Sequence, residues 1–244
     1  MNVKQTFLTG FEKGAKYVVL LDPEKLDAST GADYAARCSE AGVDALFVGG
    51  STGNHERFSN VVRNIKASST IPVVLFPGSA EQIVPYFDAV LFMSLLSGRN
   101  PRFLIEEQLR GVPAIWRHNI ETIAMGYLLV ASDAPTAVQR VSETQPLPRN
   151  NYETALHHAL AAQYFGMACV YLEAGSGASQ PVPEEMIRKV KSGISIPLIV
   201  GGGIRTPEMA AQIVKAGANI VVTGNILEKD ASLLPLFVRA VHGR

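Results

Sequence analysis

The sequence predicts one α/β domain over residues 1–244, folded as a (β/α)₈ or TIM barrel. Short apolar runs alternate with stretches of helical spacing along the whole chain, and eight of these runs have the length of strands. The length of 244 residues also suits a single barrel, since such barrels have about 250 residues. A helix–glycine–strand pattern that recurs along the chain favours repeated βα units.

The predicted strands are mostly continuous apolar runs, which is typical of parallel strands covered on both faces. They occupy residues 17–22, 44–49, 72–76, 89–94, 124–130, 168–173, 197–201 and 219–224. Helices are expected near residues 30–41, 54–67, 101–110, 151–165, 184–192, 207–216 and 231–242. The segment between strands three and four is short and contains Pro85, so the helix of the third unit is expected to be irregular or missing.

The internal repeat is clearest between residues 35–49 (AARCSEAGVDALFVG) and 210–224 (AAQIVKAGANIVVTG). Three alanines and two glycines coincide, and a weaker copy lies at residues 161–173. We interpret each copy as a helix that ends at glycine and leads into a buried strand. The longest predicted loop, residues 131–149, is either functional or contains an element that the pattern does not reveal.

The composition excludes several classes of protein. With 22 basic and 22 acidic residues the formal charge is zero, so no nucleic-acid or anionic-membrane footprint is expected. A hydrophobic content of 47% excludes disorder, and 18% charged residues leave room for an apolar groove or an oligomer interface. Cys38 and Cys169 lie in apolar runs and indicate neither a disulfide framework nor a zinc site. A soluble, cytoplasmic protein without a membrane span is expected.

Glycine-rich loops follow the last two predicted strands. In GGGIRTPE (201–208) the glycines permit close backbone approach, and Thr206 before Pro207 resembles a helix N-cap. Free N–H groups there would favour a phosphate, and Gly224-Asn225 follows the neighbouring strand. The alternative is that these glycines only form tight turns.

Glu173 ends an otherwise apolar strand, where its carboxylate would point into the barrel mouth as a base or hydroxyl ligand. Tyr171 alternates with it and should face the same side. The alternatives are a solvated loop glutamate and a core tyrosine. Asp22, at the end of strand one, and Ser51, at the end of strand two, could supply oxygens to one Mg²⁺ ion, although Asp-Pro is also a common turn opener.

Other residue types suggest no further chemistry. The five histidines lack metal-ligand spacing, and no Ser-His-Asp or Cys-His arrangement is evident. The aromatic and apolar residues around strands three to five are expected in the core, with an apolar channel as the alternative. They are Phe76, Tyr86, Phe87, Phe92, Met93, Trp116 and Tyr127.

Seven segments carry a resemblance that covers the chain from first strand to last loop. They are LLDPEK (20–25), FVGGSTG (47–53), SLLSGRNP (94–101), PLPRN (146–150), YLEAGSGA (171–178), GGGIRTPE (201–208) and VTGN (222–225). With these segments the chain resembles the geranylgeranylglyceryl phosphate synthase family of prenyltransferases. The resemblance implies a barrel that lacks a regular third helix. It also implies transfer of a long allylic prenyl group from its diphosphate to the C3 hydroxyl of sn-glycerol 1-phosphate, in a homo-oligomer.

The resemblance also implies residue roles. Asp22 and Ser51 would bind Mg²⁺, and Glu173, with Tyr171 beside it, would act on the glycerol hydroxyls. The glycerol phosphate would be held by Tyr171, Leu172, Glu173, Ala174, Gly175, Ser176, Gly177, Gly202, Gly203, Gly224 and Asn225. The residue that forms the floor of the prenyl groove is left open, with Trp116 as a guess. Two alternatives remain from the residues alone: another phosphate-binding barrel isomerase or synthase, and a barrel that binds a phosphorylated ligand without catalysis.

Overall fold

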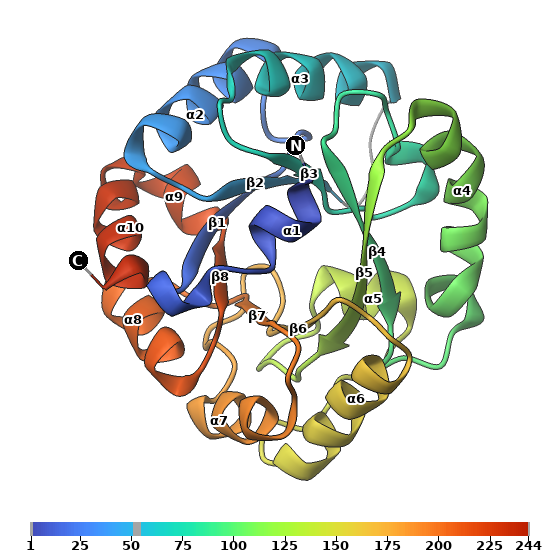
Figure 1. Cartoon of the computed structure of the whole chain (residues 1–244), viewed down its shortest axis with the longest axis vertical. Coiled ribbons are helices and arrows are strands. Elements are labelled where there is room, and N and C mark those ends of the chain that lie inside the picture. Colours follow the sequence, from blue (N-terminus) through green and yellow to red (C-terminus); the bar gives the residue numbers. More distant parts are fainter. Residues whose placement is uncertain (1, 51–54, 244) are drawn as a thin grey trace.

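Eight parallel strands form a closed barrel in the computed structural model, which describes residues 2–50 and 55–243 (Figure 1). The strands are β1 (Lys16–Leu21), β2 (Ala45–Val48), β3 (Val73–Leu75), β4 (Ala89–Leu95), β5 (Glu121–Leu129), β6 (Cys169–Glu173), β7 (Leu198–Gly201) and β8 (Ile220–Thr223). They pair in chain order, and β8 closes the barrel on β1. The predicted fold class is confirmed, although β5 begins at Glu121 rather than at residue 124.

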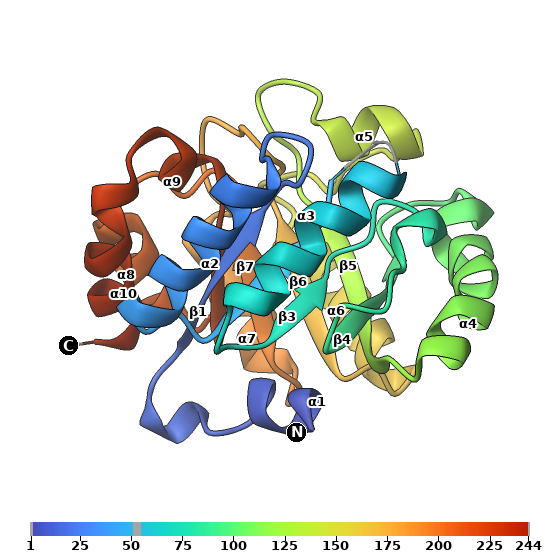
Figure 2. The same ribbon diagram turned by 90° about the horizontal axis from the view of Figure 1, so that it is seen from above.

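Helices surround the barrel, except that α1 and α5 lie over its two ends (Figures 1 and 2). They are α1 (Val3–Phe7), α2 (Ala28–Ala41), α3 (His55–Ser68), α4 (Glu107–His118), α5 (Ala137–Ser142), α6 (Tyr152–Tyr164), α7 (Glu184–Gly193), α8 (Pro207–Ala216), α9 (Asn225–Lys229) and α10 (Leu234–His242). The internal repeat corresponds to α2–β2 and α8–β8, whose helices both end at a left-handed glycine, Gly42 and Gly217. Such a glycine satisfies the last carbonyls of a helix without a Cβ clash.

The third unit departs from the regular pattern, as the sequence predicts. Between β3 and β4 the chain forms only the short 3₁₀ turn Ala80–Gln82. The following helix begins with a π-helical turn, Arg102–Glu106, and continues as α4 to His118. The predicted end of this helix at residue 110 is therefore wrong, because the helix continues through Pro113, which removes only one backbone donor.

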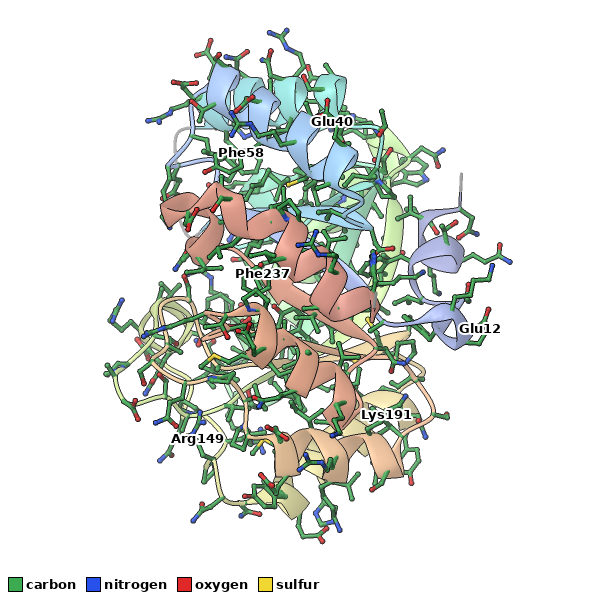
Figure 3. The ribbon with its side chains drawn as sticks, turned by 90° about the vertical axis from the view of Figure 1, so that its left-hand side faces the viewer. Glu12, Glu40, Phe58, Arg149, Lys191 and Phe237 are labelled. Atoms are coloured by element: carbon green, nitrogen blue, oxygen red, sulfur yellow. The ribbon has the colours of Figure 1, made fainter. Side chains whose placement is uncertain are left out.

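The core has two layers. Outward-facing strand residues pack against the helices. Tyr17, for example, stacks with ring centroids 5.8 Å apart on Phe237 of α10, which is labelled in Figure 3. Inward-facing residues fill the barrel. At the N-terminal end of the strands α1 closes the barrel (Figure 2), with Phe7 packed edge-on against Phe47 at 5.6 Å. The opposite end, where the strands have their carboxyl ends, is open to the cavity described next.

Candidate active site

A cavity of about 620 Å³ occupies the C-terminal mouth of the barrel. Its polar part lies at the ends of β1 and β6–β8 and is lined by Asp22, Lys25, Tyr171, Glu173, Ser176, Gly177, Gly202, Gly203, Arg205, Gly224 and Asn225. Its apolar part extends toward β3, β4 and α4 and is lined by Phe76, Ile83, Val90, Phe92, Met93, Phe103, Gly111 and Ile115. One continuous cavity thus joins a polar corner to an apolar arm.

Glu173 is the buried carboxylate of the polar corner, with 6% of its surface exposed. The alternative of a solvated loop glutamate is therefore wrong. Its Oε1 accepts a hydrogen bond from the backbone N–H of Gly175 at 2.6 Å, and its carboxylate accepts one from the Tyr171 hydroxyl. Burial raises the pKa of Glu173 to about 7, although these two hydrogen bonds oppose the increase.

Tyr171 lies on the same face of β6, as the alternation of the strand predicts. Its ring is fully inside the barrel and packs against Tyr127 at 5.4 Å and Phe76 at 5.8 Å between centroids. Burial, and then the charge of Glu173, raise the pKa of Tyr171 well above its usual value. The hydroxyl consequently stays protonated and donates to Glu173. Tyr171 is thus a core tyrosine whose hydroxyl also reaches the site.

The glycines after β7 allow close approach to Glu173, so they do more than make a tight turn. A Cβ on Gly202 would lie 2.2 Å from Oε1 of Glu173, and one on Gly203 would lie 2.3 Å from the carbonyl oxygen of Gln180. Gly202 also has φ of +81°, which disfavours any side chain. The contact at Gly202 shows that the β7 loop lies directly against the carboxylate. Thr206 caps α8 as predicted, accepting from the N–H of Met209.

The structure separates the predicted glycerol-phosphate segment 171–177 into different groups. Leu172 and Ala174 are buried in the outer core layer, so their side chains do not line the cavity. The N–H of Ala174 bonds to the carbonyl of Gly201, and that of Gly175 bonds to Glu173. The cavity itself is lined by Tyr171, Glu173, Ser176, Gly177, Gly202, Gly203, Gly224 and Asn225.

The loops after β6 and β8 meet at Asn225. Its Nδ2 donates to Ser176 Oγ at 2.9 Å, and its Oδ1 accepts from Lys25 Nζ at 3.2 Å. Lys25 also lies 3.8 Å from Asp22 Oδ2. The polar corner therefore contains the Lys25 ammonium between the Asp22 carboxylate and the side chain of Asn225. Such an environment is suited to binding anionic oxygens.

Asp22 opens a turn and also faces the cavity, while its role as a Mg²⁺ ligand stays a prediction. Its Oδ1 accepts from the N–H of Glu24 at 3.1 Å, as expected of a turn opener, and its side chain lines the cavity. Ser51 lies outside the described residues. Gly50, which precedes it, is placed directly beside Asp22, since a Cβ there would lie 2.7 Å from Oδ1. The end of β2 thus approaches the end of β1, as the prediction of a shared ion requires.

A Mg²⁺ ion fits this donor set. Within residues 2–50 and 55–243 there is no cluster of three or more His, Cys, Asp or Glu side chains that could hold a metal. Mg²⁺ does not need one, because it is commonly held by one or two carboxylates together with water and substrate phosphates. The partly buried carboxylate of Asp22, 26% exposed, faces the cavity where a phosphate would lie.

The apolar arm confirms the channel alternative for part of the aromatic set. Phe76, Phe92, Met93 and Tyr127 line the cavity, whereas Phe87 is buried in the outer layer. The guess that Trp116 is the floor of the groove is wrong. It lies on the outer side of α4 with 85% of its surface exposed.

Sequence reasoning missed several lining residues. Lys25 and Arg205 lie within the motifs listed above, but the sequence suggested no role for them. Gln108 was missed because it is a polar residue on the buried face of α4, where apolar residues are expected. In the predicted loop 131–149 the chain forms α5, from which Val138 and Val141 face the cavity. The signal for α5 was Thr136, whose hydroxyl caps the helix by accepting from the N–H of Gln139.

Comparison with known proteins gives consistent matches over nearly the whole chain. Residues 11–241 match the model of the PcrB family. A geranylgeranylglyceryl phosphate synthase of Chitinophaga pinensis is 43% identical over 98% of this chain and 96% of its own length. The one of Thermococcus kodakarensis is 50% identical over 91% and 88%.

A solved structure is also similar. The (S)-3-O-geranylgeranylglyceryl phosphate synthase of Thermoplasma acidophilum, in complex with its substrate sn-glycerol-1-phosphate, superimposes with a TM-score of 0.95 at 38% identity and full coverage of both chains. In this chain no helix among the described residues has the length and apolarity needed to cross a membrane.

Proposed function

This chain belongs to the PcrB family, and from that premise we propose that it is a prenyltransferase of the geranylgeranylglyceryl phosphate synthase type. It joins geranylgeranyl diphosphate, or a similar long allylic diphosphate, to the C3 hydroxyl of sn-glycerol 1-phosphate. The products are the ether lipid precursor and diphosphate. The observation that carries this proposal is the continuous cavity, which offers a buried carboxylate and a polar corner at one end and an apolar arm at the other.

The polar corner would hold the acceptor. The phosphate of sn-glycerol 1-phosphate would lie among Ser176, Gly177, Gly203 and Asn225, which line the cavity near the start of α9. Glycine and amide groups there can approach phosphate oxygens closely. The glycerol hydroxyls then lie toward Glu173, whose carboxylate is held in position by Tyr171 and the N–H of Gly175.

The apolar arm would hold the prenyl tail of the donor. Each buried methylene group contributes about 0.8 kcal/mol, so a twenty-carbon tail provides ample binding energy. Phe76 and Phe92 line the start of this arm, and Ile83 and Ile115 line it beside α4. The missing third helix leaves the space that this tail would occupy, because only a 3₁₀ turn separates β3 from β4.

The chemistry requires the allylic C1–O bond to break and a new ether C–O bond to form. Asp22, together with Ser51, would hold Mg²⁺, which when bound neutralises the charge of the departing diphosphate. Glu173 orients the C3 hydroxyl of the acceptor toward C1 of the donor and accepts its proton as the ether bond forms. A pKa of about 7 suits this task, since the carboxyl can hold or release a proton near neutral pH.

Two further proposals accompany this function. The enzyme works in the cytoplasm, which is supported by the two free and buried cysteines. It also self-associates, which is supported by the exposed apolar side chains on α4.

Product formation tests the proposal most directly. Purified protein is incubated with geranylgeranyl diphosphate, Mg²⁺ and either sn-glycerol 1-phosphate or its 3-phosphate enantiomer. Ether product from the 1-phosphate alone is expected. It should be lost in Glu173→Gln and retained in Glu12→Gln, an exposed change at the opposite end of the molecule from Arg149 and the mouth loops (Figure 3). A folded protein that binds glycerol phosphate but makes no product with any prenyl donor would contradict the proposal.

Ligand binding tests the two halves of the site separately. Thermal stabilisation by sn-glycerol 1-phosphate should not need Mg²⁺, whereas stabilisation by inorganic diphosphate should need it. Asp22→Asn should remove the Mg²⁺-dependent stabilisation and leave that by glycerol phosphate. Equal loss of both would show that Asp22 supports the whole mouth rather than a metal.

A further inference from the structure

Gln82 is a buried glutamine at the end of the 3₁₀ turn in the third unit. Only 8% of its surface is exposed, and both ends of its carboxamide are bonded. Its Oε1 accepts from the backbone N–H of Gly78 at 2.8 Å, and its Nε2 donates to the backbone carbonyl of Gly50 at 2.7 Å. These partners fix the orientation of the amide, because an N–H can only donate and a carbonyl can only accept. The second bond reaches 32 residues back along the chain, to the end of β2.

The carboxamide of Gln82 takes the place of a backbone bond between β2 and β3. Near the end of this strand pair the N–H of Phe76 donates to the carbonyl of Val48 at 2.9 Å. In a parallel pair the next equivalent bond lies two residues further along each strand, and it would join the N–H of Gly78 to the carbonyl of Gly50. In the structure both groups bond to Gln82 instead. Gln82 can replace the direct bond because a carboxamide carries the same kinds of donor and acceptor as a peptide group.

The strand ends that are joined in this way lie too close together for side chains. A Cβ on Gly49 would lie 1.8 Å from the carbonyl oxygen of Phe76, and one on Gly50 would lie 2.7 Å from Oδ1 of Asp22. The N–H of Gly49 also bonds to the carbonyl of the last residue of β1 at 3.1 Å, so the end of β2 is held between β1 and β3. Because the backbone of Gly50 contacts the carboxylate of Asp22, a shift of this backbone would change the space available to that carboxylate.

We propose that Gln82 is a positioning residue for the transfer reaction, and that its bond to Gly50 keeps the carboxylate of Asp22 in the orientation that Mg²⁺ binding requires. This role rests on the proposed function, because it needs Asp22 to hold the ion. Gln82 is not among the residues that line the cavity, so it acts through Gly50. Groups that orient a metal ligand from outside typically change metal affinity by about ten- to a hundredfold when they are removed.

The same side chain connects the metal end of the cavity to the apolar arm. Ala80 lines the cavity just before Gln82 in the chain, and Ile83 lines it just after. Glu107 of α4 holds the other side of this turn, since its Oε2 accepts from the N–H of Ala80 at 2.9 Å. The groups that would bind the acceptor lie across the mouth, on the loops after β6–β8. Loss of Gln82 should therefore weaken binding of Mg²⁺ with diphosphate and leave the acceptor corner unchanged.

The test measures ligand binding by thermal stabilisation of the full-length protein, without a prenyl donor or turnover. One titration varies Mg²⁺ at a fixed concentration of inorganic diphosphate, and the other varies sn-glycerol 1-phosphate without Mg²⁺. Gln82→Met has nearly the same size but removes both hydrogen bonds. It should raise the Mg²⁺ concentration for half-maximal stabilisation at least about tenfold, while the dissociation constant for glycerol phosphate stays unchanged.

Two other variants complete the test. Gln82→Asn keeps the carboxamide but is one methylene group too short to reach both partners. It should change Mg²⁺ binding in the same direction, and it replaces Gln82→Met if that variant is too unstable to titrate. The matched control is Gln163→Met in α6. Gln163 accepts from the N–H and the hydroxyl of Ser195 at 2.7 and 3.1 Å, before β7 and so at the end of the barrel opposite the mouth. Its loss should leave both titrations unchanged.

Three results would overturn this role of Gln82. They are variants whose Mg²⁺ titrations match that of the wild type, variants that lose Mg²⁺ and glycerol phosphate binding to the same extent, and a wild type whose stabilisation by diphosphate needs no Mg²⁺. The second result would show that Gln82 supports the whole mouth instead. A wild type that makes no ether product, but whose Mg²⁺ binding is weakened by Gln82→Met, would leave the role standing and contradict only the proposed function.

Discussion

Replacing Glu173 with Gln should abolish transfer while making the folded protein more stable above neutral pH. The carboxyl is buried, and its pKa in the folded protein is about 7, compared with 4.5 for an unperturbed glutamate. Glutamine has nearly the same shape and keeps an oxygen that can accept from Gly175 and Tyr171, but it never becomes charged. The variant therefore measures the free-energy cost of burying the charge without the additional cost of removing the side chain.

The pH dependence follows from the protonation of the two states. Below pH 4.5 the carboxyl is protonated in both the folded and the unfolded chain. Between pH 4.5 and about 7 the folded protein keeps a proton that the unfolded chain has released, so the stability due to this group falls as pH rises. Above pH 7 the loss of stability caused by the buried charge stays constant at about 3 kcal/mol, since each unit of difference between the folded and unfolded pKa values corresponds to about 1.4 kcal/mol.

The stability difference between Glu173→Gln and the wild type should therefore grow by about 3 kcal/mol between pH 4.5 and pH 8. For a chain of this size that corresponds to about 6–12 °C in Tm. The assay is thermal or urea unfolding of both proteins without Mg²⁺ or phosphate, because bound ligands would stabilise the wild type selectively. Glu12→Gln, which changes an exposed carboxylate, should show no such pH dependence. A difference that is the same at both pH values, or a variant that is less stable at pH 8, would refute the reasoning.

Three other changes test the neighbours of this carboxylate and the closed end of the barrel. Tyr171→Phe removes a hydrogen bond that lowers the pKa of Glu173, so the rise of kcat/KM with pH should move to higher pH, and an unmoved profile would count against that bond. Gly202→Ala places a methyl group against Oε1 of Glu173 and should lower kcat strongly, whereas Gly166→Ala, also at positive φ but with no atom within 4 Å, should lower only stability, by about 1–2 kcal/mol. Glu121→Ala removes the acceptor for two N–H groups of α1 and should lower the unfolding free energy by about 1 kcal/mol with unchanged kcat, as measured by urea unfolding and product assay.

The barrel was predictable because the sequence patterns that indicate it are local and recur along the chain. Eight apolar runs, glycines after helices and the short third unit all appear in the pattern, and the structure has each of them. The polar corner was predictable for the same reason, since Asp22, Glu173 and Gly202 each follow or end a strand. Where several strands end together, their last residues must meet.

The features that sequence reasoning missed depend on packing across the chain. The apolar residues of α4 do not show in the sequence which face of the helix is buried. The barrel buries Gln108 and Gly111, whereas Leu109 and Trp116 are exposed. Likewise α5 is short and has few buried residues, so its apolar period is too brief to recognise. The alternation of side chains along β6 predicts that Leu172 and Tyr171 face opposite sides of the strand. This was missed because the whole motif was assigned to the glycerol-phosphate site.

The position of the cavity divides the barrel into two halves with separate tasks. Strands β6–β8 supply the carboxylate and the glycine-rich corner, whereas β3, β4 and α4 supply the apolar arm, where only a 3₁₀ turn stands in the third unit. Substitutions in β4 and α4 can lengthen, shorten or reshape the arm without any contact with Glu173. The donor preference of such an enzyme can therefore diverge between relatives while its acceptor and its reaction stay the same.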